Sequence, residues 1–348
     1  MKKLVLLDAN HLMHRAYWAI DRRLKTTRGE QVNAVFGVVS MLLTMLSRER
    51  PDLLLACFDE GKETFRHQDH REYKAGRAET PDDFYTQIPR VHEALRAFAI
   101  PILSDPKYEA DDLIGSAAIR AAKEEWDVLI VTGDRDLFQM ADTRICIAVP
   151  HKGYTEPHYL DAAGVKEALG VTPAQVPDYK GLTGDASDNL RGVRGIGPKT
   201  AVSLIEKFGS LEAIYEHLPE IRFSVKEKLL ADKESAFFCK KLARLVTDII
   251  LPEGILQASF SPERAAVERF FATLELKTLL RRFQKFLEED PYAREHFRGE
   301  GAENLLLEES LQEPSFAPDG VELVPSSVEG EGREGKKRLT EEQLPLLV

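Results

Sequence analysis

The first half of the chain alternates short apolar runs with longer stretches in which apolar residues recur at helical spacing. Apolar runs of this length predict buried strands, and the longer stretches predict amphipathic helices. The predicted strands cover residues 3–7, 53–58, 100–103, 127–132 and 144–149. Strands that alternate with helices favour a mostly parallel sheet with helices on both faces. We therefore expect an α/β domain over residues 1–155.

After about residue 155 the strand pattern stops. Helices are expected at residues 201–208, 211–217, 226–246 and 262–287. Beyond residue 291 the sequence is rich in Glu, Gly, Pro and Ser with little periodicity, and residues 298–338 are predicted to be disordered. The predicted organisation is thus an α/β domain, a helical region over residues 156–290 and an acidic tail over residues 291–348.

Composition and charge narrow the class of protein. Apolar residues make up 43% of the 348 positions and charged residues 30%, which is typical of a soluble globular protein. There is no signal-peptide pattern and no apolar run of membrane-spanning length, and the three cysteines are scattered. We expect a reduced, cytoplasmic, monomeric protein. The net charge of −11 does not exclude a nucleic-acid partner, because acids that surround metal ions are neutralised locally.

Acidic residues follow three of the predicted strands, stand at the start of one helix and recur at residues 185 and 188. The nine are Asp8, Asp59, Glu109, Asp111, Asp112, Asp134, Asp136, Asp185 and Asp188. The ends of parallel strands share one edge of a sheet, and Asp185 and Asp188 are spaced to share one face of a helical turn. Each acid alone could be a helix cap or turn residue. Together they would repel one another without cations, so they predict two Mg²⁺ or Mn²⁺ ions.

Two other segments have features of a nucleic-acid interface. Residues 192–197 form a glycine-rich turn followed by Pro198, Lys199 and Thr200, and backbone N–H groups at such a helix start bind phosphate. Residues 65–77 interleave basic and aromatic side chains. Taken singly, the turn could be an ordinary connection between helices, and the basic run could be a solvated face.

These motifs together resemble the 5′-nuclease family, which includes the nuclease domain of bacterial DNA polymerase I, phage 5′-exonucleases and flap endonucleases. The matching segments are residues 7–12, 58–59, 65–67, 73–77, 108–112, 132–137 and 182–201. The resemblance implies a PIN-like α/β fold, a basic helical arch at about residues 62–82, and a helix-three-turn-helix element at about residues 184–208. It also implies a structure-specific 5′-3′ exonuclease or flap endonuclease that cuts branched DNA and RNA primers in replication and repair.

The resemblance also assigns roles to individual residues. One metal would be held by Asp8, Asp59, Glu109 and Asp111, and the second by Asp112, Asp134, Asp136, Asp185 and Asp188. Lys74 and Arg77 would hold the scissile phosphate, Tyr73 would stack on an unpaired base, and Arg66 and Arg71 would contact DNA. The turn residues Gly192, Val193, Gly195, Ile196, Gly197, Lys199 and Thr200 would grip duplex backbone. A K⁺ ion near Val193 and Ile196 is a further expectation.

The match departs from the family pattern at Ala9, Arg135 and Arg191, and the last adds charge before the turn. Two rival functions remain open: a PIN-type ribonuclease, which would lack the helical DNA-binding turn, and a non-catalytic branched-DNA-binding protein, which would lack one of the acids. Residues 339–348 resemble clamp-binding peptides, with Gln343, Leu344, Leu346 and Leu347 as anchors, although an apolar frayed end would look the same. The expected partners are therefore DNA, a sliding clamp and a separate DNA polymerase, in the bacterial nucleoid, unless the chain is part of a polymerase I.

Overall fold

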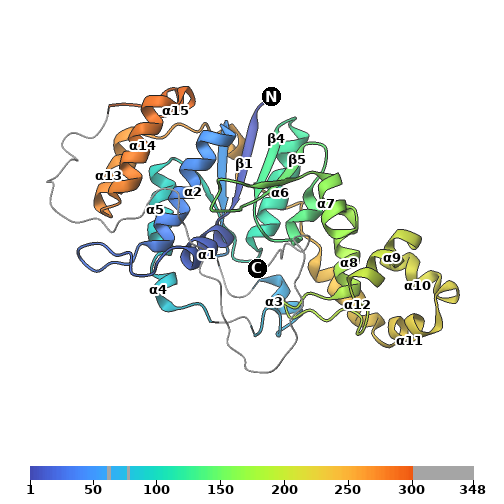
Figure 1. Cartoon of the computed structure of the whole chain (residues 1–348). Coiled ribbons are helices and arrows are strands. Elements are labelled where there is room, and N and C mark those ends of the chain that lie inside the picture. Colours follow the sequence, from blue (N-terminus) through green and yellow to red (C-terminus); the bar gives the residue numbers. More distant parts are fainter. Residues whose placement is uncertain (61–63, 77–78, 301–348) are drawn as a thin grey trace, which may run out of the picture. The chain divides into compact units, whose positions relative to one another are not determined.

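The computed structural model describes residues 1–60, 64–76 and 79–300 (Figure 1). Its sheet has the strand order β3-β2-β1-β4-β5-β6. The strands are β1 (Lys3–Asp8), β2 (Leu53–Cys57), β3 (Ile102–Leu103), β4 (Asp127–Val131), β5 (Ile145–Val149) and β6 (His158–Leu160). β1 to β5 pair in parallel, as predicted, whereas β6 pairs antiparallel with β5. β6 is not predicted from the sequence, because this edge strand has no buried apolar run.

Helices cover both faces of the sheet, which confirms the predicted fold class. Alternate strand residues point to opposite faces: Val5 and Leu7 join one apolar core, and Leu4 and Leu6 join the other. The helices of the α/β part are α1 (Ala9–Ala19), α2 (Asn33–Glu49), α3 (Phe65–Asp69), α4 (Asp82–Tyr85), α5 (Ile88–Ala97), α6 (Ala110–Lys123) and α7 (Ala162–Leu169). The first core contains α1, α2 and α5, and the second contains α6.

The last three helices, α13 (Arg264–Thr273), α14 (Lys277–Glu289) and α15 (Pro291–His296), also belong to the first core. They lie beside α2 and α5 (Figure 1). We expected one helix over residues 262–287 within the helical region. It is instead two helices that meet at Glu275, where φ is 56°, and they pack on the α/β part. No glycine or proline marks this break in the sequence.

The helical region contains α8 (Val176–Thr183), α9 (Pro198–Phe208), α10 (Leu211–Glu216), α11 (Phe223–Ala231) and α12 (Lys233–Ala243). Short 3₁₀ helices complete the chain: η1 (Asp136–Met140), η2 (Pro173–Gln175), η3 (Leu218–Glu220) and η4 (Ile255–Gln257). The single helix expected at residues 226–246 is interrupted at Asp232, whose carboxylate accepts a hydrogen bond from the Arg194 backbone N–H at 2.9 Å. No helix in the described part of the chain is both long and apolar enough to cross a membrane.

Several predictions concern residues beyond the described ranges. Arg77 is one of them, and so are the clamp-binding residues Gln343, Leu344, Leu346 and Leu347. Most of the tail predicted to be disordered lies there as well. At the start of that tail, however, Arg298 is placed in a β-bridge with Glu263, so the regular structure continues past the predicted boundary.

Candidate metal centre

Three of the predicted acids lie where parallel strands end at the same edge of the sheet. Asp8 is the last residue of β1, Asp59 follows β2, and Asp134 follows β4. β2 and β4 flank β1 in the sheet. The strand order reverses at β1, and ligand sites of open α/β sheets form outside strand ends at such a point.

Asp8 and Asp134 are linked through the Thr132 hydroxyl group. This hydroxyl donates to Asp8 Oδ2 at 2.7 Å and accepts from the Asp134 backbone N–H at 2.9 Å. The other oxygen of Asp8 caps α1, because Oδ1 accepts the His11 N–H at 3.0 Å. Burial raises the pKa of Asp8 above its ordinary value. The side chain is therefore both a helix cap and a member of the acidic group.

Asp111 lies in the first turn of α6 and faces the same group. Burial raises the pKa of Asp111 well above its ordinary value, and the negative charges of Asp134, Asp8 and Asp59 raise it further. Asp59 is oriented by the Ala110 backbone N–H, which donates to its Oδ1 at 2.7 Å. Asp8, Asp59, Asp111 and Asp134 thus form one set of mutually repelling carboxylates.

A second set contains Asp136, Asp185 and Asp188, each of which offers one oxygen within 4.8 Å of the others. The predicted proximity of Asp185 and Asp188 is correct, but the predicted helical turn is wrong. α8 ends before them, and Asp185 and Leu190 exchange backbone hydrogen bonds of 2.9 and 2.8 Å across a tight turn. The loop closes because Gly184 adopts a φ of 75°.

Lys180 of α8 lies between two of these acids, and the sequence analysis missed it. Its ammonium pairs with Asp136 and, at 2.5 Å, with Asp185. Burial raises the pKa of Asp136 to about 7, although Lys180 opposes this. Burial would raise the pKa of Asp185, but the ion pair with Lys180 and the hydrogen bonds from Ser187 together lower it to about 2. Lys180 is a single lysine in a short helix, and nothing in the sequence distinguishes it from a solvated lysine. Only its burial in the folded chain identifies it as a partner of the acids.

Tyr73 connects Glu109, at the start of α6, with Asp188 of the second set. Its hydroxyl lies 3.2 Å from Glu109 Oε2 and 3.0 Å from Asp188 Oδ2. Lys74 also holds Glu109, since its Nζ donates to Oε1 at 2.8 Å. The Tyr73 side chain is buried, with only 4% of the residue exposed. Its ring is therefore not presented for the predicted stacking on a base.

Arg66 and Asp112 differ most from their predicted roles. Arg66 is 2% exposed, so it is not available as the predicted DNA contact. Its guanidinium donates to both oxygens of Asp112 and to the backbone carbonyls of Leu242 and Arg244. Asp112 is fully buried and also accepts the Val246 N–H at 2.9 Å. This pair joins α3 and α6 to the end of α12, whereas Arg71 is exposed.

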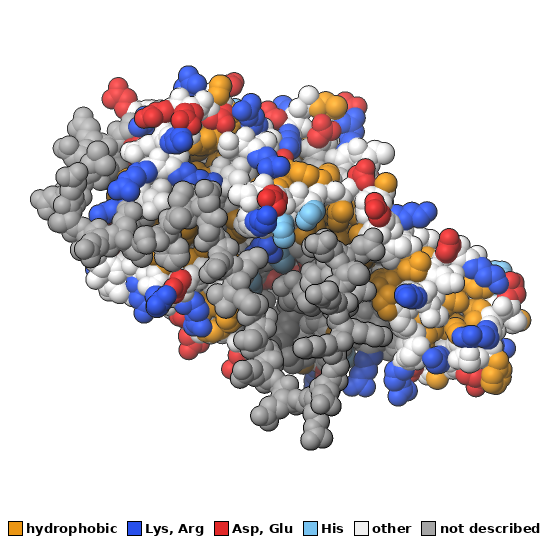
Figure 2. Space-filling view, in the orientation of Figure 1, with side chains coloured by type: hydrophobic (Ala, Val, Ile, Leu, Met, Phe, Trp, Pro, Cys, Tyr) orange, Lys and Arg blue, Asp and Glu red, His pale blue; other side chains and the backbone are white. Residues whose placement is uncertain are grey.

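The predicted glycine turn lies between α8 and α9. A side chain at Gly192 would place its Cβ 2.2 Å from the Gly184 nitrogen, so glycine permits this close approach of two backbones. Gly197 caps α9, with Pro198 at the first helical position and Lys199 exposed beside it. Figure 2 shows Lys and Arg side chains over the surface formed by α9 to α11. Val193 and Ile196 are buried, while Thr200 donates its backbone N–H to Gly197.

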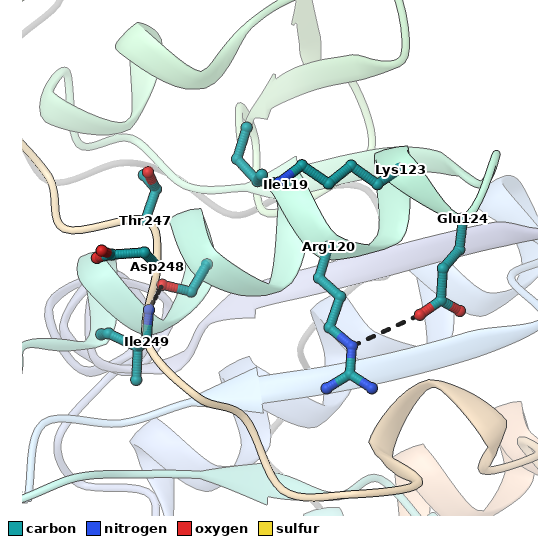
Figure 3. Close-up of a pocket in the computed structure, with 8 residues that line it drawn as sticks. Ile119, Arg120, Lys123, Glu124, Thr247, Asp248 and Ile249 are labelled. Atoms are coloured by element: carbon teal, nitrogen blue, oxygen red, sulfur yellow. Dashed lines mark hydrogen bonds and ion pairs between the residues drawn. The ribbon is translucent and has the colours of Figure 1, made fainter.

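A pocket of about 370 Å³ lies elsewhere, between α6 and residues 247–249 (Figure 3). Ser116, Arg120 and Lys123 of α6 line it, and the Ser116 hydroxyl accepts the Ile249 N–H at 3.2 Å. Among the described residues that line it there is none of the nine predicted acids. The candidate centre is therefore the carboxylate edge of the sheet and not this pocket.

Comparison with known proteins identifies the family. Residues 3–170 match the family profile described as 5′-3′ exonuclease, N-terminal resolvase-like domain, and residues 171–266 match the one described as 5′-3′ exonuclease, C-terminal SAM fold. The chain belongs to the 5′-3′ exonuclease family. DNA polymerase I of Bacillus subtilis is 40% identical over 285 residues, which cover 81% of this chain and 32% of that protein. The thermostable DNA polymerase I of Thermus thermophilus is 38% identical over 331 residues, covering 95% and 38%. The exonuclease-family chain thus spans about a third of the length of these relatives.

Solved structures share the fold. The 5′-exonuclease of T5, solved with zinc bound, superposes with a TM-score of 0.60 at 21% identity and covers 80% of this chain and 99% of its own. The catalytic core of Rad2, solved with a DNA substrate, gives a TM-score of 0.55 at 20% identity, covering 81% and 92%. These likenesses confirm the fold predicted from the sequence.

The residues of this exonuclease-family chain fit a divalent metal. Asp8 and Asp111 are buried beside other carboxylates, and burial raises the pKa of each. Three further oxygens converge within 4.8 Å at Asp136, Asp185 and Asp188. Oxygen donors alone, in this number, suit a hard cation, which would also remove the repulsion among the acids. The centre thus has the chemistry expected in a metal-dependent nuclease family.

Proposed function

We propose that the chain is a structure-specific 5′-nuclease that hydrolyses phosphodiester bonds at 5′ ends and 5′ flaps of branched DNA and in RNA primers paired to DNA. One observation carries this proposal above the others. Asp136, Asp185 and Asp188 bring oxygens within 4.8 Å of one another, and Tyr73 joins Asp188 to Glu109 at the start of α6. Acids from the sheet and from the helical region therefore meet in one centre.

The residues divide into two metal-binding sets. Asp8, Asp59, Glu109 and Asp111 would hold one ion, Asp136, Asp185 and Asp188 the other, and Asp134 would lie between them. Two Mg²⁺ or Mn²⁺ ions, when bound, supply activation of water and stabilisation of charge in an in-line displacement. Asp112 is left out of both sets because it is fully buried and both of its oxygens are bonded to Arg66, whereas Glu109 accepts from Arg66 through Oε2 alone, at 3.2 Å.

Hydrogen bonds from the chain's own side chains and backbone orient these acids. Thr132 fixes Asp8, the Ala110 N–H fixes Asp59, and Tyr73 with Lys74 fixes Glu109. Lys74 lies on the surface side of Glu109, with 21% of its side chain exposed, so its ammonium can also approach a scissile phosphate. Arg77 keeps its proposed role beside Lys74 on sequence grounds alone.

Duplex DNA would be held by its backbone at the glycine turn, with little dependence on base sequence. The exposed N-terminus of α9 at Gly197 to Lys199 supports this. A T5 flap endonuclease of similar fold was solved as a complex with DNA and metal ions, at a TM-score of 0.58 and 21% identity. A ribonuclease without such a turn fits less well, and a non-catalytic protein would not need all nine acids. The sliding-clamp contact, the separate polymerase and the nucleoid location stay predictions.

The test is cleavage of a 5′-labelled flap, a nicked duplex and a plain single strand, with Mg²⁺ and with EDTA. Wild-type protein should cut the flap only with Mg²⁺. Asp185→Asn should lower the rate by up to about a hundredfold, because it replaces a proposed metal-binding carboxylate with a neutral amide. The control Glu288→Gln lies on the exposed side of α14 and should cut as wild type does. Metal-independent cleavage, or no cleavage of any substrate, would refute the proposal.

A further inference from the structure

Helix α11 supplies a positive charge to the glycine turn. Lys228 Nζ donates to the Gly195 carbonyl oxygen at 2.8 Å. At the end of the same helix, Asp232 accepts the Arg194 backbone N–H at 2.9 Å and pairs with the Arg194 guanidinium at 3.2 Å. Two consecutive residues of the turn are therefore held from one helix, which the sequence analysis did not associate with the turn.

The Lys228 side chain runs across Gly195 at van der Waals distance. A Cβ at position 195 would lie 2.8 Å from Lys228 Nζ and 3.1 Å from Cε. Gly195 also has a φ of 77°, which disfavours other residues. Glycine is thus favoured by the backbone conformation, and a side chain at position 195 would displace the end of the lysine from its present position.

A cation is needed at this turn for an electrostatic reason. Carbonyl oxygens carry partial negative charge, so a carbonyl near the path of the DNA backbone repels a phosphate unless a cation lies between them. The resemblance implied a K⁺ ion near Val193 and Ile196. In the structure the Val193 carbonyl accepts the Ile196 N–H at 3.1 Å, and the Gly195 carbonyl, one residue before Ile196, accepts a hydrogen bond from the Lys228 ammonium.

We propose that Lys228 is the cation of this turn, so that duplex binding needs no K⁺. An ammonium has three N–H groups. One is bonded to Gly195, and the others can reach phosphate oxygens beside the N-terminus of α9. Lys228 thus both holds the turn in shape and neutralises one backbone phosphate. This inference rests on the proposed function, in which the turn holds duplex DNA.

The test measures binding of a fluorescent duplex with a 5′ overhang by anisotropy, in EDTA so that no cleavage occurs. Wild type, Lys228→Met, Lys228→Arg and the control Lys226→Met are compared over a series of KCl, NaCl and tetramethylammonium chloride concentrations. Lys226 lies two residues earlier in α11, about 200° around the helix from Lys228. Thermal unfolding of each variant shows whether it is folded.

Wild-type affinity should be the same in all three salts at equal concentration. Lys228→Met should weaken binding about eightfold at 0.1 M salt and lower the slope of log K against log salt by about 0.9, the value for one phosphate contact. Lys228→Arg should restore the slope, and Lys226→Met should leave it unchanged. A wild type that binds only in K⁺, or a folded Lys228→Met with an unchanged slope, overturns the proposal. If wild type binds no duplex in any salt, the proposed function fails as well.

Discussion

Both carboxylate oxygens of Asp112 are bonded to the guanidinium of Arg66, at 2.6 and 2.8 Å. The neighbouring residue, Asp111, faces the acidic set at the sheet edge, where the charges of Asp134 and Asp8 help to raise its pKa. Two adjacent acids at one helix start thus have different tasks. We propose that Asp111 belongs to the metal centre, whereas Asp112 joins α6 to α3 and to the end of α12.

Asp112→Asn should therefore reduce stability and leave metal binding intact. Losing one partner of a buried ion pair costs about 3–5 kcal/mol in the free energy of unfolding. Chemical denaturation measures that loss, and titration with Mn²⁺ measures the affinity of the folded protein. The matched variant Asp134→Asn should do the opposite, with weak metal binding and a smaller change in stability. Equal loss of metal affinity in both variants would contradict the assigned roles.

Tyr73→Phe distinguishes the hydroxyl group from the ring. If the hydroxyl that joins Glu109 and Asp188 is what matters, its removal should lower the cleavage rate on the order of tenfold, the equivalent of one hydrogen bond of about 1.4 kcal/mol. The rate is measured on a 5′ flap at saturating Mg²⁺. A stacking role would be retained by phenylalanine, so an unchanged rate would favour the role expected from the sequence.

The stability of the metal-free protein should fall as pH rises through the titration of Asp136. Burial raises the pKa of Asp136 to about 7 from an ordinary value of 3.8, so the folded state keeps a proton that the unfolded chain has lost. This contribution to the free energy of unfolding is complete below about pH 4 and is lost as pH rises to about 7.

Thermal unfolding in EDTA from pH 4 to 9 measures this effect. The melting temperature of wild type should decline relative to that of Asp136→Asn between pH 4 and 7 and then run parallel to it. Mg²⁺ should bind more tightly as pH rises over the same range, with release of protons, because its ligands must be ionised. Parallel curves over the whole range would show that Asp136 is ionised throughout.

Gly192 and Gly197 should respond differently to alanine. A Cβ at Gly192 would lie 2.2 Å from the backbone of Gly184 and 2.6 Å from that of Leu182. The backbone segments around Gly184 and Gly192 would therefore have to move apart. We expect Gly192→Ala to cost about 3 kcal/mol in stability and to weaken duplex binding. A Cβ at Gly197 would meet nothing within 4 Å, and Gly197→Ala should stay within about 0.5 kcal/mol of wild type. Denaturation of both variants compares them directly.

The sheet and most of its acids could be predicted because both follow from local pattern. Apolar runs mark the strands, and parallel topology brings residues such as Asp8 and Asp134 to one edge. The partners of Glu109 and Asp112 could not be predicted in this way. Arg66 lies 46 residues before Asp112 in the chain, and its basic neighbours led to its prediction as a DNA contact.

Other errors came from breaks that carry no sequence signal. Asp232 and Glu275 interrupt expected helices without glycine or proline. Lys180 and Lys228 were missed for a related reason. A single lysine in a helix has no periodicity that distinguishes a buried ion pair or a bonded carbonyl from a solvated side chain, so its role depends on tertiary contacts alone.

The packing of α13 to α15 on α2 and α5 has a consequence for biosynthesis. The ring of Phe98, at the end of α5, packs against the rings of Phe271, Phe283 and Phe297. The distance between ring centroids is 6.1 Å in each pair. The ribosome must therefore synthesise nearly 300 residues before α13 to α15 can pack on α2 and α5, which are made much earlier. Until then the apolar side chains of α2 and α5 are open to chaperones or to aggregation. In a truncated product that stops at residue 266, where the family match ends, the apolar side chains of α2 and α5 would stay exposed.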